Sequence, residues 1–466
     1  MQQVMVDERR REGDHAVTRH GASRRARWAA VVGSALAAAV LGLCFLTTGV
    51  QSPFDEMAHF DYVAKLAEGD VPQVGEDLGQ ESLREFACRS EPTTPLGAAC
   101  GATSVDPALA PFEGQSYTTE YFPTFYGVTA VVSKALGAVP GVSLLEAARL
   151  ADLLWLCLGV AAVAALSLRL GARPTGAFAG ATLLAAMPLV LLLGTSVTND
   201  SAAIGWAALV LLVWLRLEAA PARRRVLLVG LIGLMGLTVK ETTVPGLALA
   251  ALLELRASMA TGATSSPGGH GRPAAGRLRA LVRPLALLAL PALGYGVLAV
   301  LDDGARGVAD PANKTYAFLI SLATPQGEVL RDAVAAGLTP FAAPDDLPGV
   351  AAAVLAVTGV LALAFGVLSA GSAAHVVLRS TLPWRADTLT VVRQGFLVGA
   401  LVTGPVFLVA TRVTAGVAFY NPRYALPLAA VGAAAVFADL SRRWSAAVAG
   451  AALVVVGVLA LGYLVA

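Results

Sequence analysis

Residues 28–50 read WAAVVGSALAAAVLGLCFLTTGV and contain no charged side chain. A helix that crosses the hydrocarbon core of a bilayer needs about 20 mostly apolar residues, so this stretch is long enough to span a membrane. Similar uncharged runs occur at 175–194, 350–370 and 396–411. Because each charge at the centre of a bilayer costs about 2.5–3.5 kcal/mol on insertion scales, these four runs together predict a polytopic membrane protein.

The composition of the whole chain supports the same fold class. The 466 residues are 56% hydrophobic and only 14% charged, with a mean hydropathy of +0.68, whereas a soluble domain usually carries about 25% charged residues. We therefore expect an all-α polytopic membrane protein with about 11 transmembrane helices. The expected spans are 28–50, 147–168, 174–194, 201–215, 226–239, 243–255, 284–301, 350–370, 395–411, 424–438 and 446–465.

The distribution of Lys and Arg predicts the orientation of these spans. Residues 1–27 hold seven Arg, and placing them in the cytoplasm puts 23 of the 34 Lys and Arg residues on the cytoplasmic side. This bias is the one that membrane proteins show. The apolar run at 28–50 ends in TTGVQSP rather than in a small-residue cleavage site, so we interpret it as an uncleaved anchor. The sequence thus predicts a multi-pass plasma-membrane protein with a cytoplasmic N-terminus.

The same orientation divides the chain into a basic cytoplasmic tail, 1–27, and a transmembrane domain, 28–466. Within that domain, the expected loops are a large outer loop at 51–146, a cytoplasmic linker at 256–283 and a second outer loop at 302–349. The linker is rich in Gly, Ser, Pro and Arg, which is typical of a flexible segment. If residues 121–137 formed a span, Arg169 and Arg173 would be exported, so we expect these residues to form a helix at the outer interface instead.

Two cysteines lie in the large outer loop. Cys88 and Cys100 are twelve residues apart, and an outer loop faces an oxidising compartment, so a disulfide between them is expected. Two free thiols are the alternative.

The first group of candidate functional residues follows the first span directly. Asp55, His59 and Tyr62 would share one face of a helix, because they are spaced i, i+4 and i+7, while Glu56 would point elsewhere. A carboxylate at the water–lipid boundary is suited to act as a general base, so Asp55 and Glu56 are the candidate catalytic residues. The alternative is that Asp55 only caps the following helix.

Further candidates lie at the expected outer ends of later spans, where ionisable residues are costly and usually functional. Asn199 and Asp200 separate two spans, with a helix cap as the alternative. Lys240 and Glu241 separate two short apolar segments, where Lys240 would bind a phosphate or pair with Glu241.

Arginines and tyrosines complete the set of candidates. Arg149 begins a span, and pairing with Glu146 or Asp152 is its alternative role. Near the C-terminus lie four further candidates for substrate binding, of which the arginines suit bidentate phosphate contact and have snorkelling to lipid head groups as their alternative: Arg412, Tyr420, Arg423 and Tyr424.

Several classes of function find no support in the sequence. It has no Walker A motif, no Ser-His-Asp array and only five His in total, so we expect no metal site of the zinc type and no cofactor. We expect no nucleic-acid partner either.

The motifs occur in an order that resembles the GT-C superfamily, membrane glycosyltransferases that use sugars linked to polyprenyl phosphate. In chain order the matching segments are FDEMAHF (54–60), YFPTFYG (121–127), Ala148-Arg149-Leu150, VTNDS (197–201), GLMGLTVKETT (233–243) and NPRYALPL (421–428). Within that superfamily, the chain is most similar to the bacterial membrane proteins of domain-of-unknown-function family 2142, over about residues 28 to 440. The usual Pro pair of the second motif is reduced here to Phe122-Pro123.

This resemblance implies transfer of a sugar, with inversion, from a polyprenyl-phosphate donor to an envelope glycan, lipid or protein on the outer face of the membrane. It implies that Asp55 takes a proton from the acceptor, and that Arg423, Arg412 and Lys240 stabilise the leaving phosphate. Glu56, His59, Asn199 and Asp200 would orient sugar hydroxyls or Asp55. Two other classes stay open: a transporter or flippase of lipid-linked envelope precursors, and a non-catalytic scaffold for envelope assembly.

Overall fold

The computed structural model describes residues 24–46, 55–90, 92–264, 273–306, 388–392, 394–395, 426–438 and 440. These residues are predominantly helical and include no β-strand; their only β-bridge joins Asp77 to Gln115. The predicted all-α class is therefore confirmed for the described part of the chain. The expected spans 350–370, 395–411 and 446–465 lie almost entirely outside it.

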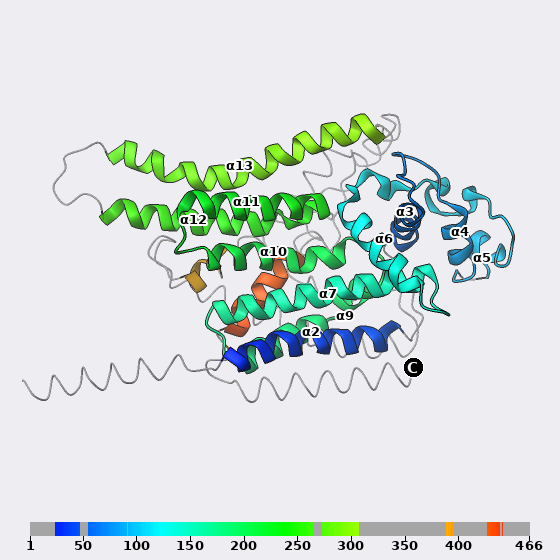
Figure 1. Ribbon diagram of the computed structural model, residues 1–466, viewed down its shortest axis with the longest axis horizontal. Coiled ribbons are helices and arrows are strands. Elements are labelled where there is room, and N and C mark those ends of the chain that lie inside the picture. Colours follow the sequence, from blue (N-terminus) through cyan, green and yellow to red (C-terminus); the bar gives the residue numbers. More distant parts are fainter. Residues whose placement is uncertain are drawn as a thin grey trace, which may run out of the picture.

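Long helices form a bundle in which they run side by side (Figure 1). Three of them contain segments that are long and apolar enough to cross a membrane, Arg24–Leu46, Leu144–Arg169 and Ala280–Arg306, which is typical of a membrane protein. The helices of the bundle are α2 (Arg24–Leu46), α7 (Leu144–Arg169), α8 (Pro174–Ala185), α9 (Pro188–Thr195), α10 (Asp200–Arg216), α11 (Ala222–Val239), α12 (Val244–Thr264) and α13 (Pro273–Arg306). The short apolar helix Leu426–Ala438 packs into the same core.

Shorter helices gather at one end of the bundle, which we call the capped end (Figure 1). They come from the segment between the first two long helices, so this segment folds into a helical layer with its own apolar core. The opposite end is called the far end below. The helices of the layer are α3 (Glu56–Glu68), α4 (Gln80–Ala87), α5 (Pro95–Ala98) and α6 (Pro123–Gly137), with 3-10 turns at Pro107–Leu109, Pro111–Gly114 and Tyr117–Glu120.

Helix α7 is central and packs against α2, α6, α8 and α10. A capping box starts it, because the Ser143 side chain accepts from the Glu146 amide while Glu146 accepts from the Ser143 amide. Its contact with α10 is very close at Gly159 and Gly205, where a Cβ on Gly205 would come within 2.1 Å of the Gly159 Cα. The absence of side chains at these two positions lets the backbones approach, as in other membrane helix pairs.

The helix boundaries differ from the expected spans at two places. Residues 174–194, expected as one span, form α8 and α9, which are bent by 73° at a break next to Pro188. Proline lacks the amide hydrogen that would continue the helix. Helices α12 and α13 also extend to Thr264 and from Pro273, so helix enters both ends of the expected linker 256–283.

Candidate functional site

Asp55 begins the layer at the capped end and has an unusual backbone conformation. It lies directly before α3 with φ of 59°, in the left-handed region that Asp tolerates better than most residues. Its side chain makes no capping hydrogen bond to the helix, which contradicts the alternative role of a simple cap. Instead, the Tyr117 hydroxyl donates to Asp55 Oδ1 at 2.7 Å. The carboxylate is therefore held by a tyrosine while remaining partly exposed.

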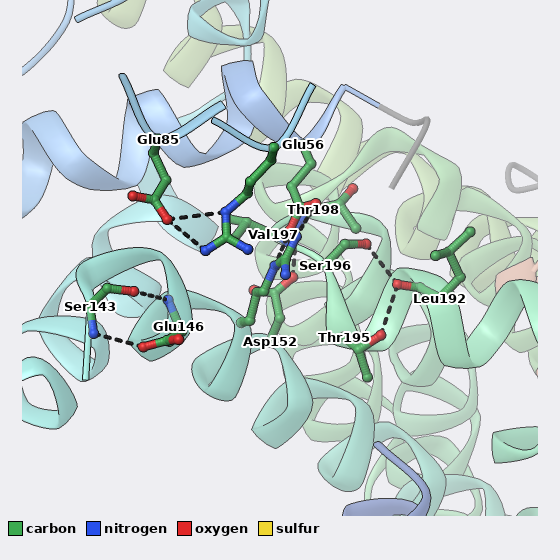
Figure 2. A network of polar contacts seen from close by, with 12 residues as sticks. Glu56, Glu85, Ser143, Glu146, Asp152, Leu192, Thr195, Ser196, Val197 and Thr198 are labelled. Atoms are coloured by element: carbon green, nitrogen blue, oxygen red, sulfur yellow. Dashed lines mark hydrogen bonds and ion pairs between the residues drawn. The ribbon is translucent and has the colours of Figure 1, made fainter. Parts of the chain in front are cut away.

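Glu56, the next residue, is buried and held from three sides. Arg149 of α7 donates to it through Nε at 2.7 Å and through Nη2 at 2.8 Å, and the Val197 amide donates to Oε1 at 3.1 Å. Figure 2 shows Glu56 beside Val197. Arg149 thus pairs with a residue 93 positions away, and not with Glu146 or Asp152 as the alternative supposed. Glu56 is therefore a buried carboxylate that accepts three hydrogen bonds, unlike the partly exposed Asp55.

A second buried carboxylate, Asp152, binds the turn 196–199, which also contains Val197. Asp152, one turn further along α7 than Arg149, accepts from the Thr198 amide at 2.7 Å. The turn 196–199 leads directly into α10, and its two amides point to carboxylates from two different segments (Figure 2). These bonds fix the position of Asn199 and Asp200.

Lys240 meets this turn from the end of α11. Its Nζ lies 2.6 Å from Asp200 Oδ1 and 2.9 Å from Asn199 Oδ1, and the Asn199 amide donates to the Val239 carbonyl at 3.2 Å. The side chains of both partners are only 2% exposed in the ion pair. The structure thus joins Lys240 to Asp200, not to Glu241 as the alternative supposed. Asn199 occupies the cap position of α10 without a capping side-chain bond, so its amide is used to hold Lys240.

Aromatic rings connect Lys240 to the start of α3. The Lys240 ammonium lies 5.8 Å from the centre of the Tyr121 ring, and His59 stacks on the same ring at 6.1 Å with only 10° between the planes. His59 Nδ1 is also 2.7 Å from the Tyr126 hydroxyl. His59 and Lys240 are therefore both in contact with the ring of Tyr121.

Tyr62 and Tyr126 form the interior of this aromatic group. Their rings stack at 4.1 Å, and the Tyr62 hydroxyl donates to the Tyr121 carbonyl at 3.2 Å. Burial is the main cause that raises the pKa of Tyr62 to about 12 and that of Tyr126 well above its usual value. Both side chains therefore stay neutral hydrogen-bonding groups at ordinary pH.

Four residues of this region were not among the candidates expected from the sequence: Tyr117, Tyr121, Tyr126 and Arg306. Tyr117 and Tyr126 contact Asp55 and His59 as described. Arg306, at the end of α13, donates to the Tyr62 hydroxyl at 2.7 Å and to the carbonyls of Thr119 and Tyr121, and also pairs with Asp302. YFPTFYG contains Tyr121 and Tyr126 and was singled out as an interfacial helix, so its tyrosine content was a signal for their polar role. Arg306 lies in the expected outer loop 302–349 with no such signal.

The remaining candidates fall into two groups. Arg412, Tyr420, Arg423 and Tyr424 lie outside the described residues. Cys88 and Cys100 form a disulfide bond in the layer at the capped end. Within the described ranges, no group of three or more His, Cys, Asp or Glu side chains is arranged to hold a metal ion.

Two buried ion pairs of the capped end, Arg149 with Glu56 and Lys240 with Asp200, contact the segment 197–200, and Lys240 also lies beside an aromatic ring. Asp55 supplies a partly exposed carboxylate, Lys240 a buried cation, and His59 and the tyrosines supply flat faces and hydroxyl groups. Such a combination suits a ligand with a negatively charged group and a polar ring.

Comparison with known proteins adds no assignment: no protein-family model and no curated protein matches this chain. The proposal below therefore rests on the geometry of the capped end and on the order of its motifs.

Proposed function

We propose that this protein is a membrane glycosyltransferase of the GT-C type, similar to domain-of-unknown-function family 2142. It transfers a sugar from a polyprenyl-phosphate donor to a cell-envelope acceptor, which is a glycan, lipid or protein. The proposal includes about eleven spans in the plasma membrane, a cytoplasmic N-terminus and the capped end on the outer face. The observation that carries it is a chain of contacts between four separate motifs of the resemblance: His59 stacks on Tyr121, and Lys240, paired with Asp200, lies over the same ring.

In this proposal Asp55 is the general base. It is the carboxylate of the first motif that is partly exposed, whereas Glu56 is buried and bound by three donors. Asp55 accepts the proton of the acceptor hydroxyl as the new glycosidic bond forms at the anomeric carbon. The bond from that carbon to the phosphate oxygen breaks on the opposite face, so the configuration inverts.

The phosphate leaves as an anion and needs no strong acid. Lys240 would stabilise it, because this cation lies against the aromatic cluster and comes from a motif of the resemblance. Arg412 and Arg423 complete this role in the proposal on the strength of the sequence motif. The stacked rings of His59 and Tyr121 offer a face against which a sugar ring can pack.

The proposal predicts release of free polyprenyl phosphate by the protein in nanodiscs. We would offer a panel of polyprenyl-phosphate sugars to the wild type, to Asp55→Asn and to Glu254→Gln, a carboxylate-to-amide change at the far end, and count release per folded molecule. Wild type and Glu254→Gln should release the lipid phosphate from one donor, and Asp55→Asn should be slower by about 10²–10⁴-fold, the usual contribution of a general base.

Two outcomes would redirect the assignment. Binding of the lipid without release from any donor would favour a transporter or flippase of lipid-linked precursors. Neither binding nor release would favour a non-catalytic scaffold for envelope assembly.

A further inference from the structure

Lys240, the cation proposed to bind phosphate, is already paired with Asp200 of the protein itself. The ammonium contacts one carboxylate oxygen at 2.6 Å and the Asn199 amide oxygen at 2.9 Å. These two oxygens lie where the oxygens of a phosphate would contact the lysine, and the carboxylate oxygen carries negative charge as a phosphate does. An anionic head group that uses Lys240 must therefore take the place of the protein's own carboxylate.

The position that Asp200 occupies also suits an anion for a second reason. Asp200 is the first residue of α10, which is 17 residues long, and the first turn of a helix carries a partial positive charge. A phosphate at this point would meet both the lysine and the helix N-terminus. The geometry around Asp200 therefore fits a phosphate as well as the carboxylate that fills it.

Glu56 and Asp200, two of the buried carboxylates of the capped end, have different kinds of partner. Glu56 accepts three bonds of 2.7, 2.8 and 3.1 Å. Asp200 contacts the Lys240 ammonium at 2.6 Å and the Thr198 hydroxyl at 3.4 Å. Tyr121 and Glu241, which adjoin Lys240 in space and in sequence, are partly exposed, so the pair lies close beneath the surface.

We propose that Asp200 acts as an internal competitor at Lys240, which is displaced when a phosphate head group binds. This inference rests on the proposed function and names the residue that regulates its donor site. On displacement, the carboxylate moves from the ammonium to the side of the sugar that the phosphate carries. Specificity follows, because a head group without a negative charge cannot take the place of the carboxylate.

The test measures binding of a polyprenyl monophosphate to the protein in nanodiscs made of neutral lipid. Asp200→Asn removes the competing charge and keeps the shape, so we expect about tenfold tighter binding, the gain when competition leaves roughly one molecule in ten open. Asp200→Glu keeps the charge and should bind like the wild type. Lys240→Gln should bind more weakly, and the double variant Asp200→Asn/Lys240→Gln should show no gain over Lys240→Gln.

Two further ligands separate the contributions of phosphate and lipid. Polyprenol, which lacks the phosphate, should bind equally to all variants. Inorganic phosphate alone should show the same order of variants at lower affinity, because the competition concerns only the charged group. A gain of Asp200→Asn for polyprenol would overturn the inference.

Asp200→Asn leaves a buried ammonium without its counter-charge and is expected to be less stable. A second variant therefore tests the same proposal without removing that charge. Asn199→Ala removes the other oxygen that contacts Lys240 and should also tighten binding, by a smaller factor. If wild type binds the lipid phosphate and neither variant binds it more tightly, the competitor role is wrong while the proposed function stands. If wild type neither binds nor releases it, the proposed function itself fails.

Discussion

The two ends of the helix bundle each contain a buried ion pair with bidentate geometry, yet their surroundings differ. At the far end, Arg225 pairs with Glu254 at 2.6 and 2.8 Å and also donates to main-chain carbonyls that follow α10. The Trp214 indole donates to the same carboxylate. Every partner there belongs to α10, α11, α12 or the turn between the first two, so this pair serves to close the end of a helix.

At the capped end the pairs join segments that are far apart in sequence, and one of them, Lys240 with Asp200, lies against the Tyr121 ring. Arg149 with Glu56 and Lys240 with Asp200 both converge on the turn 196–199. A buried ion pair is thus weak evidence for a functional site. The distinguishing features are a partly exposed carboxylate, an aromatic cluster and a cation that lies against that cluster.

Removal of one carboxylate from each end should give the largest effect and the clearest contrast. Glu56→Gln and Glu254→Gln each leave a buried arginine without its counter-charge, which costs about 3–5 kcal/mol of stability. Thermal unfolding in the same detergent measures this loss. Only Glu56→Gln should also lower polyprenyl-phosphate release per folded molecule, by about 10²-fold, because it frees the turn that positions Asp200. Equal losses of activity would erase the contrast between the ends.

Loss of the disulfide should destabilise the layer at the capped end without touching the pairs. Cys88→Ser/Cys100→Ser opens a link between residues twelve positions apart, which is worth about 3 kcal/mol in the chain-entropy account. Limited proteolysis should then cut between α4 and α5 before it cuts the bundle. We expect activity to fall only as this cleavage proceeds. A loss of activity in the uncut variant would instead place the disulfide in the site.

Tyr117 offers a milder change inside the site. Tyr117→Phe removes the hydroxyl that donates to Asp55, and hydrogen bonds to charged groups contribute about 1.5–3 kcal/mol. We expect polyprenyl-phosphate release about tenfold slower, with unchanged lipid binding, because the carboxylate is less well oriented. Tyr295→Phe, which removes a hydroxyl bonded to Glu241, is the matched control, and a slowing equal to that of Tyr117→Phe would argue against the role of Asp55.

Alkaline pH should weaken the capped end before the far end. The folded protein keeps the Tyr62 proton up to a pKa of about 12, while an unfolded tyrosine loses its proton near 10. Between these values the unfolded state binds fewer protons, so stability falls as pH rises, by up to about 1.4 kcal/mol per pH unit. Tyr62→Phe should make this slope smaller, with Tyr126 supplying the remainder. Stability is measured against pH, and the ionisation of tyrosine is followed by tyrosinate absorbance. The same slope of stability against pH in Tyr62→Phe and in the wild type would contradict the burial of Tyr62.

The long helices were predictable because their cause is local. The absence of charge in 28–50 needs no knowledge of the rest of the fold. The sequence shows Pro188, but it does not show that the helix bends sharply there, since a proline in a membrane helix is often tolerated.

The pairing within the site was not predictable in the same way. The sequence offered near neighbours, such as Glu146 for Arg149 and Glu241 for Lys240, whereas the structure uses partners that are 93 and 40 positions away, Glu56 and Asp200. Such choices depend on which helix ends meet, and a single sequence does not contain this information. Several carboxylates and cations expected at one end do meet there among the described residues, because the alternating direction of the helices brings them together.

The most direct test of the account locates the donor on the molecule. A polyprenyl-phosphate sugar with a photoreactive diazirine on the sugar would be cross-linked to the protein in nanodiscs, and the labelled peptides identified by mass spectrometry. The account predicts saturable labelling near Asp55, Tyr121 and the turn 196–199, reduced in Lys240→Gln and unchanged in Arg225→Met. Labelling at the far end around Glu254, or labelling that excess unmodified donor does not suppress, would contradict it.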